Sequence, residues 1–151
     1  MNEPPTKNYT PSEIDIGIFA LHPLAHTPTF GTEGSAGADL YAIEDQYVHA
    51  GEPAKIRTGL AFVIPEGYKM LVHPRSSNLI LRNVIEPTLI VDSDYTGEVF
   101  VTWYPTKDYA ILAGDRVAQV TIEEAIKPRF KVVDRLPETK RGSGGYGSTG
   151  R

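Results

Sequence analysis

Short apolar runs, each ended by glycine or proline, follow one another along most of this chain. In the first run, isoleucine or alanine occupies every second position from Ile14 to Ala20. Period-two alternation, and runs rich in valine, threonine and aromatic residues, are typical of β-strands. The runs that follow are Gly59–Ile64, Tyr68–Val72, Glu98–Tyr104, Arg116–Ile122 and Arg129–Val133. Each of these runs is predicted to be a strand.

The turn residues determine the predicted fold class. Twelve prolines and fourteen glycines divide the chain into short pieces and leave little room for helices. Such punctuation predicts an all-β sandwich or barrel with one short helix directly after Arg75. Of these we expect a distorted jelly-roll β-barrel. We expect the barrel to occupy residues 1–136, of which 1–11 are flexible. Residues 137–151 are too polar to pack, so they are expected to form a mobile C-terminal arm.

Composition narrows the class of protein. The chain has 151 residues, of which 40% are hydrophobic, which suits one domain with its own core. A net charge of -4 argues against binding of bulk nucleic acid. The absence of cysteine excludes disulfides, thiolate metal sites and thiol catalysis. No apolar run approaches the ~18 residues of a membrane span, and Met1–Pro11 is no signal peptide, so we expect a cytoplasmic protein without a membrane partner.

The segment Arg141–Arg151 combines five glycines with a single aromatic residue, Tyr146, and carries an arginine at each end. Glycine lets backbone N–H groups approach an anion closely, and arginine forms strong hydrogen bonds with phosphate. A lone ring in such an arm can cover a flat group. The segment therefore fits a nucleotide, although glycine richness alone also fits a flexible solubilising tail.

A second polar stretch, Arg75-Ser76-Ser77-Asn78, follows a proline at the end of a predicted strand. If a helix begins here, its free N–H groups together with arginine and serine side chains form an anion site. The alternative is that serine and asparagine merely cap the helix. Both roles can share these residues.

A third stretch, from Asp92 to Gly97, lies between two predicted strands. It resembles the start of a calcium loop, but the closing glutamate of such a loop would fall at Trp103. Asp94 and Gly97 are turn formers, which makes a hairpin turn the structural alternative. A turn does not explain Asp92, because a carboxylate at the end of a buried strand is costly without a task. Asp92 is therefore a candidate general base.

Two further stretches complete the set. Ser35–Ala42 places small residues beside Asp39, a pattern that also fits a simple turn into a strand. In Ala113–Val120, Gln119 interrupts an apolar period-two pattern. Its amide either donates to a phosphate oxygen or is satisfied by backbone inside the barrel. We interpret the four histidines as structural or surface residues.

Taken in chain order, these stretches resemble the five motifs of the trimeric dUTP pyrophosphatase (dUTPase) family, from about Leu21 to Gly150. Any one motif is weak, but five in order, ending in the glycine-rich arm, form a specific signature. The resemblance implies a β-clip jelly roll that assembles as a homotrimer with three active sites. Each site is built from all three chains, and the arm of one subunit closes over a site formed by the other two.

The resemblance also implies a reaction: Mg²⁺-assisted hydrolysis of dUTP to dUMP and pyrophosphate, which limits uracil incorporation into DNA and supplies dUMP for dTTP synthesis. Asp92 would activate water for in-line attack on the α-phosphorus. Tyr95 would lie against the deoxyribose, and Tyr146 would stack on uracil. Asp39 would touch the magnesium shell only through water. The phosphate contacts would come from Arg75, Ser76, Ser77, Gln119, Arg141, Gly145, Ser148 and Thr149.

Three stretches of the chain depart from the pattern of the family, at four positions. Pro87 and Leu89 stand near the places where glycines often read the uracil edge, and proline lacks an N–H donor. Asn78 follows Ser77 where many members have leucine. Tyr146 replaces a common phenylalanine, which keeps a stacking ring and adds a hydroxyl.

Two other functions are compatible with the sequence. A dCTP deaminase has a related barrel and a similar Arg75-Ser76-Ser77 motif, and Glu86 is the one acid placed to serve as its catalytic glutamate. Deaminases lack the tyrosine-containing arm, however. A nucleotide-sensing regulatory protein that contacts a protein partner could use the same fold.

Overall fold

The structure is a computed structural model that describes residues 13–145. These residues form twelve strands and one helix. In chain order the elements are β1 (Gly17–Ala20), β2 (Thr29–Phe30), β3 (Ala38–Tyr41), β4 (Gln46–Val48), β5 (Ala54–Arg57), β6 (Leu60–Val63), β7 (Tyr68–His73), α1 (Ser76–Arg82), β8 (Val84–Ile85), β9 (Leu89–Val91), β10 (Phe100–Pro105), β11 (Tyr109–Ile111) and β12 (Arg116–Glu124). The helix is too short to cross a membrane, and the described residues contain no longer one.

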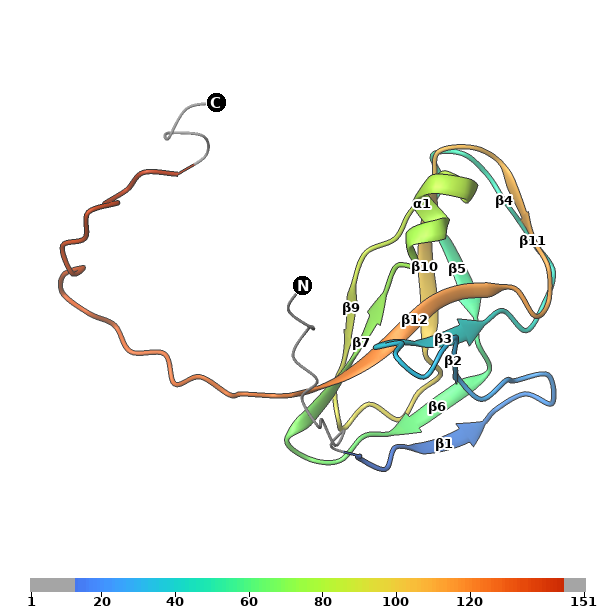
Figure 1. The fold of residues 1–151 in the computed structure, drawn as a ribbon, viewed down its shortest axis with the longest axis horizontal. Coiled ribbons are helices and arrows are strands. Elements are labelled where there is room, and N and C mark those ends of the chain that lie inside the picture. The colour runs from blue at the N-terminus through green and yellow to red at the C-terminus, as the bar shows by residue number, and fades with distance from the viewer. Residues whose placement is uncertain (1–12, 146–151) are drawn as a thin grey trace, which may run out of the picture.

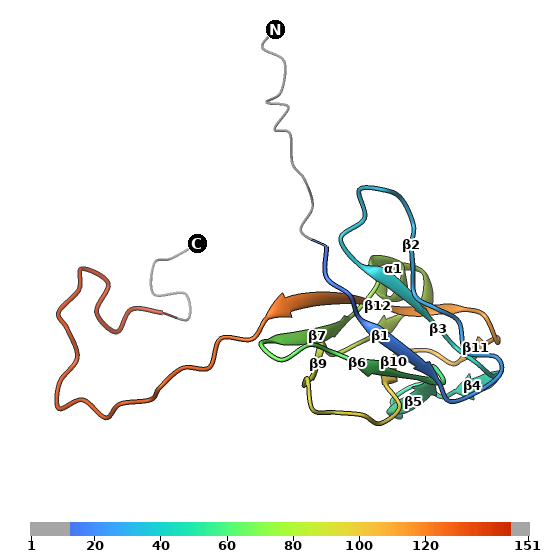
Figure 2. The same cartoon turned by 90° about the horizontal axis from the view of Figure 1, so that it is seen from below.

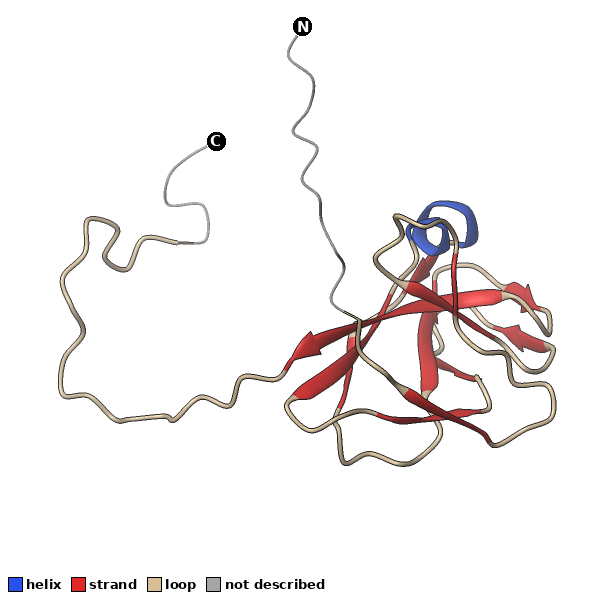
Figure 3. Cartoon of the chain, turned by 60° about the horizontal axis from the view of Figure 1, so that its bottom comes forward, coloured by secondary structure: helices blue, strands red, loops and turns tan. Residues whose placement is uncertain are grey.

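The strands form an antiparallel barrel with α1 at one end (Figures 1 and 3). The largest sheet has the order β2-β3-β12-β7-β9, and smaller sheets pair β1 with β6, β5 and β8 with β10, and β11 with β4. The long strand β12 lies at the centre of the large sheet between β3 and β7, and its Gln119 stands opposite both Asp39 and His73. The predicted all-β jelly-roll fold is confirmed.

The core fills the space between these sheets. Trp103 of β10 is completely buried, and its indole Nε1–H donates to the carbonyl oxygen of Val117 at 3.0 Å. This bond satisfies the one polar atom of the ring, which is a requirement when tryptophan is buried. Because Val117 lies on β12, the core ties β10 to the strand that carries Gln119.

Most of the predicted elements are present. The five runs before residue 125 correspond to β1, β6, β7, β10 and β12, and α1 begins directly after Arg75. The predicted strand Arg129–Val133 is wrong, because these residues form no strand. Phe130 is 93% exposed and Val132 is fully exposed, so residues 13–145 offer the segment no neighbour to pair with. A strand needs a hydrogen-bonding partner as well as a suitable pattern.

The chain leaves the barrel where β12 ends, at Glu124. Beyond that point residues 125–145 run away from the barrel without helix or strand (Figures 1 and 2). Among the described residues, the last backbone hydrogen bond to the barrel joins the Ala125 N–H to the Gly67 carbonyl at 2.7 Å. The predicted division between barrel and arm at residue 136 stays a prediction.

Candidate active site

One cleft of about 450 Å³ lies at the start of α1 and is called the α1 cleft. It is formed by the loop before β3, by β3 itself, by the turn into α1 and by the first half of β12. Its lining residues are Gly31, Ser35, Ala36, Gly37, Asp39, Arg75, Ser76, Ser77, Arg116 and Gln119. The structure therefore brings together every predicted phosphate-binding residue of the barrel, and adds the predicted metal-shell residue Asp39.

Charge in the α1 cleft is set by three side chains. The buried Asp39 carboxylate lies 2.9 Å from Nε of Arg75 and 3.7 Å from Nε of Arg116. Arg75 Nη1 also donates to the Arg116 carbonyl oxygen at 3.3 Å. Two guanidinium groups against one carboxylate leave a net positive charge, which suits an anionic ligand, and guanidinium groups match phosphate oxygens in geometry.

Gln119 forms the opposite wall of the α1 cleft. Its Nε2 donates to the Pro74 carbonyl at 2.9 Å, so the amide is satisfied by backbone, as the structural alternative expected. The same side chain still lines the cleft. A Cβ at Gly37 would lie 2.6 Å from Gln119 Oε1, so a larger residue there would push the glutamine side chain aside.

The turn into α1 does not match the alternative in which serine and asparagine merely cap the helix. The N-cap residue is Arg75, and no side chain caps the helix. Among the described residues, the hydroxyls of Ser76 and Ser77 make no hydrogen bond, although both line the cleft. Both hydroxyls are therefore available to a ligand.

A second cleft, of about 560 Å³, holds Asp92 and is called the hairpin cleft. It is lined by Ile64, Glu66, Gly67, Tyr68, Lys69, Asp92, Ser93, Asp94, Ala125 and Lys127. The Tyr95 N–H donates to the Asp92 carbonyl at 3.1 Å, which makes the expected turn. Asp92 itself is exposed, so the expectation of a carboxylate at a buried strand end is wrong: β9 is an edge strand and its end faces water.

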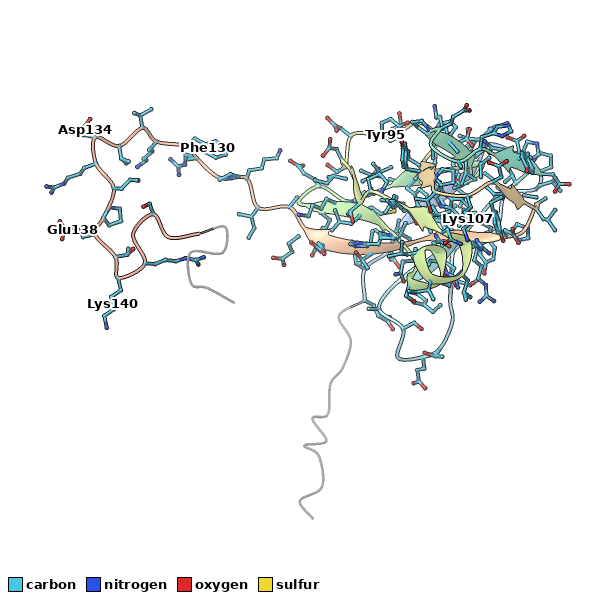
Figure 4. All side chains as sticks on the ribbon, turned by 90° about the horizontal axis from the view of Figure 1, so that it is seen from above. Tyr95, Lys107, Phe130, Asp134, Glu138 and Lys140 are labelled. Carbon is cyan, nitrogen blue, oxygen red and sulfur yellow. The ribbon has the colours of Figure 1, made fainter. Side chains whose placement is uncertain are left out.

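Tyr95 is fixed within the same hairpin turn (Figure 4). Its hydroxyl donates to the Glu98 carbonyl at 2.9 Å, and a Cβ at Gly97 would lie 2.6 Å from that hydroxyl. Gly97 therefore lets the ring fold back over the turn. The ring remains 45% exposed and can contact a ligand from outside the chain's own barrel.

The two clefts lie at opposite ends of β12. Arg116 and Gln119 line the α1 cleft, whereas Ala125 follows the last residue of the strand and lines the hairpin cleft. Ala125 lies six positions beyond Gln119 along extended chain, a distance of about 20 Å. Within one chain, Asp92 and Tyr95 are therefore not brought to the predicted phosphate-binding residues.

The predicted arm residues lie apart from both clefts. Arg141 donates from Nε to the Gly144 carbonyl at 2.8 Å, a bond within the arm itself, and neither Arg141 nor Gly145 lines a cleft. Tyr146, Ser148 and Thr149 lie outside the described residues.

The structure also adds cleft residues that the sequence did not single out. Arg116 pairs with Asp39, yet an arginine at the start of a strand carries no distinguishing signal.

The departures at Pro87 and Leu89 have a local explanation. Pro87 is exposed and precedes β9, so it removes no ladder hydrogen bond, whereas Leu89 pairs with Val72 and packs against the core.

Glu86 is buried behind the α1 cleft and lines neither cleft. Its Oε2 accepts a 2.9 Å hydrogen bond from Nδ2 of Asn78, which is also buried. Burial raises the pKa of Glu86 to about 8, although Asn78 and Arg75 oppose the shift.

Residues 13–145 contain no group of three or more histidine, aspartate or glutamate side chains arranged to hold a metal ion. Asp39 supplies one carboxylate to the α1 cleft, and both of its oxygens already face arginines. A metal ion in this cleft would need most of its ligands from the substrate and from water.

The sequence is similar to known enzymes along most of its length. The family model for dUTPase matches residues 24–150. The deoxyuridine 5'-triphosphate nucleotidohydrolase of Thermobifida fusca is 38% identical over 143 residues, which cover 91% of this chain and 79% of the relative. The enzyme of the same name from Helicobacter pylori is 37% identical over 141 residues, which cover 91% of this chain and 97% of the relative.

Solved structures match the fold. The dUTPase of Staphylococcus bacteriophage 80alpha, in a variant carrying dUpNHpp, superposes with a TM-score of 0.82 at 24% identity and covers 91% of this chain and 99% of its own. A variant dUTPase from phage phi11 of S. aureus, described for its structural Mg(II) ion, has a TM-score of 0.76 at 22% identity and covers 82% and 99%. The matched family model, the relatives and the shared barrel lead to one conclusion: this chain belongs to the dUTPase family.

Proposed function

We propose that this protein is a dUTP diphosphatase, which hydrolyses dUTP to dUMP and pyrophosphate. The observation that carries the proposal is the α1 cleft. Arg75, Ser76, Ser77 and Gln119 surround a net positive cavity, and both serine hydroxyls are free of protein partners among the described residues. Membership of the dUTPase family supports the choice of substrate. In the cell this reaction limits uracil incorporation into DNA and supplies dUMP for dTTP synthesis.

In the proposed mechanism Asp92 is the general base. Its exposed carboxylate takes a proton from water, and the resulting nucleophile attacks the α-phosphorus in line with the departing pyrophosphate. The bond between the α-phosphorus and the bridging oxygen breaks, so dUMP and pyrophosphate are released. General-base assistance of this kind contributes ~10²–10⁴-fold to the rate.

The single carboxylate of the α1 cleft suits a magnesium ion that would be bound mainly by the triphosphate. Magnesium retains several waters and takes few protein ligands, so one carboxylate, Asp39, is enough to orient the hydrated ion through water. When bound, the ion neutralises negative charge on the phosphates. Arg75 and Arg116 hold the Asp39 carboxylate in place for this task.

The separation of the two clefts supports an active site shared between subunits. Gln119 of the α1 cleft and Ala125 of the hairpin cleft are separated by about 20 Å of extended chain, which supports supply of Asp92 and Tyr95 to a given α1 cleft by a second chain. The segment between β12 and the arm, residues 125–136, supports the same assembly, because its apolar side chains are exposed and need a partner. These side chains are Ile126, Phe130, Val132, Val133 and Leu136. A homotrimer in which the third chain's arm, with Arg141 and Tyr146, closes the site satisfies these demands.

Neither alternative function gains support from a specific observation. A deaminase needs its glutamate in the substrate pocket, whereas Glu86 lines neither cleft and is bound to Asn78. A regulatory role with a protein partner stays a prediction. Pyrophosphate release from dUTP, compared with dCTP, dTTP and UTP, and ammonia release from dCTP separate these functions.

Subunit mixing tests the shared site directly. We expect Asp92→Asn and Arg75→Ala to be inactive separately, because each lacks an essential group. After the two variants are co-refolded in equal amounts, about a quarter of the sites should contain an intact Asp92 from one chain and an intact Arg75 from another. Recovery of dUTP hydrolysis towards that fraction supports the shared site. Absence of recovery in verified mixed oligomers would place both residues in one chain's site and overturn the assembly.

A further inference from the structure

Directly behind the α1 cleft lies a buried polar pair, Asn78 and Glu86. Among the described residues, Asn78 Oδ1 and Glu86 Oε1 are the buried side-chain polar atoms without a hydrogen-bond partner. Both orphaned atoms are oxygens, and both belong to side chains already joined by a 2.9 Å bond from Asn78 Nδ2 to Glu86 Oε2. Two unsatisfied acceptors within one contact indicate that a hydrogen-bond donor is missing.

The orientation of the Asn78 amide is fixed by its second bond. Nδ2 also donates to the Val117 carbonyl at 2.9 Å, an oxygen that Trp103 Nε1 approaches from the other side. A reversed amide would turn Oδ1 towards that carbonyl, and two acceptors would repel each other. Oδ1 therefore needs a donor. A protonated Glu86 carboxyl supplies one on Oε1, the oxygen that has no partner.

The surroundings favour a neutral Glu86. Burial raises its pKa to about 8, while the Asn78 hydrogen bond and the backbone N–H and charge of Arg75 lower it. The neighbours from β12 and β10, Val117 and Trp103, are uncharged. The other arginine of α1, Arg82, instead donates to the Arg116 carbonyl and lies over aromatic rings. Arg75 is thus the one charged group acting on Glu86 among the described residues.

The pair is linked to two of the segments that build the α1 cleft, the turn into α1 and β12. Asn78 follows Ser77 in α1, and its amide holds Val117, which lies between Arg116 and Gln119 on β12. The backbone N–H and the charge of Arg75, at the turn into the helix, lower the pKa of Glu86. A change in this pair is therefore transmitted to the turn and to β12 without any contact between the pair and the ligand.

We propose that Asn78 and a protonated Glu86 form a closed amide–acid pair that positions the Arg75–Ser77 turn for phosphate binding. Both are positioning residues, and the inference rests on the proposed function of the α1 cleft. The carboxyl O–H donates to Asn78 Oδ1, and Asn78 Nδ2 donates to Glu86 Oε2, so both orphaned atoms are satisfied. Loss of the proton removes that donor, leaves a buried charge and loosens the turn.

The test is the pH dependence of KM and kcat for dUTP between about pH 6 and pH 9.5. We expect the wild-type KM to rise about tenfold between pH 7 and pH 9 as Glu86 ionises, with a smaller change in kcat. In Glu86→Gln, whose amide keeps a donor and cannot ionise, this alkaline rise should disappear. Asn78→Leu should raise KM about tenfold at neutral pH, because it removes the bond to Val117 and isolates Glu86. The exposed Glu52→Gln is the matched control and should keep the wild-type profile.

A second measurement does not depend on activity. A carboxyl with a raised pKa in the folded state binds its proton more tightly there than in the unfolded chain. The stability that it contributes is present below the ordinary value of 4.5 and is lost as pH rises towards about 8. As the pH rises across this window, wild type should lose stability that Glu86→Gln does not lose. The Tm of Glu86→Gln minus that of wild type should therefore increase across the window and stay constant above it. A constant Tm difference, or an alkaline KM rise that persists in Glu86→Gln, would overturn the proposal. A wild type that does not hydrolyse dUTP would instead contradict the proposed function, and the Tm comparison would still decide the state of the pair.

Discussion

The two clefts differ in how completely one chain builds them. In the α1 cleft, Asp39 is buried, Arg75 is half-buried, and ion pairs and backbone bonds fix every charged group. In the hairpin cleft, Asp92 is exposed and Tyr95 is 45% exposed, and their fixed contacts lie within the turn itself. One chain thus assembles the proposed phosphate site but presents its candidate base outward.

This contrast has a physical reason. Preorganised donors bind charge well because they need no rearrangement when the ligand arrives, which favours a packed cleft for the triphosphate. Exclusion of bulk water strengthens the electrostatic interactions of a charged base, and exclusion requires a cover. If the neighbouring chain and the arm provide that cover, Asp92 becomes more effective in the assembled and closed state.

Replacement of Asp92 should have the largest effect. Asp92→Asn keeps the shape of the side chain but removes the proton acceptor, so kcat for dUTP should fall ~10²–10⁴-fold while KM changes little. Steady-state pyrophosphate release, with light scattering to verify the oligomer, measures this. Asp94→Asn is the matched control, because asparagine is as good a turn former and should leave most activity. Turnover near the wild-type rate in an intact Asp92→Asn oligomer would remove Asp92 from the role of base.

Removal of residues 141–151 should have the second-largest effect. The resemblance gives this segment the role of a lid, so kcat/KM for dUTP should fall about 100-fold through loss of substrate positioning. Tm should stay close to wild type, because the hydrogen bond of Arg141 lies within the arm and not on the barrel. Calorimetry and pyrophosphate release on the same sample separate the two effects. Full activity in the truncated protein would contradict closure by the arm.

The sequence predicted the long strands because each is long enough to show a repeating pattern. Strands such as β2 (Thr29–Phe30) and β8 (Val84–Ile85) have two residues and carry no periodicity to detect. Arg129–Val133 failed for the opposite reason. Its pattern fits a strand, but strand formation depends on a neighbour, and residues 13–145 offer none to it.

The site was predictable wherever a motif carried several polar residues together. Arg75, Ser76 and Ser77 come from one such motif, and the structure joins them to Asp39 and Gln119 from two others. The buried pair behind them was not predictable. Glu86 stands between a short strand and Pro87, where an acid usually faces water, and only the packing of α1 over it makes it buried.

Addition of a side chain at position 37, beside Gln119, should perturb the α1 cleft moderately. In Gly37→Ala the new Cβ would lie 2.6 Å from Gln119 Oε1, so the glutamine must move from the cleft wall. We expect KM for dUTP to rise about tenfold with kcat nearly unchanged, because one phosphate donor is displaced. Gly34→Ala is the matched control in the same loop, since its Cβ would meet nothing within 4 Å. Equal KM values in the two variants would show that Gln119 does not contribute to binding.

The smallest effect should come from Tyr95→Phe. The change removes only the O–H bond to the Glu98 carbonyl, which is worth about 0.5–1.5 kcal/mol, and the ring keeps its place over Gly97. If the ring excludes a 2′-hydroxyl by its shape, the ratio of kcat/KM for dUTP to that for UTP should stay within a few-fold of wild type. A Gly97→Ala variant, whose Cβ would lie 2.6 Å from the Tyr95 hydroxyl, should move the ring and lower that ratio more. If Tyr95→Phe instead lowered the ratio more than Gly97→Ala, the hydroxyl and not the ring would be the discriminating group. The hairpin cleft would then read its ligand through a polar contact, as is proposed for the α1 cleft.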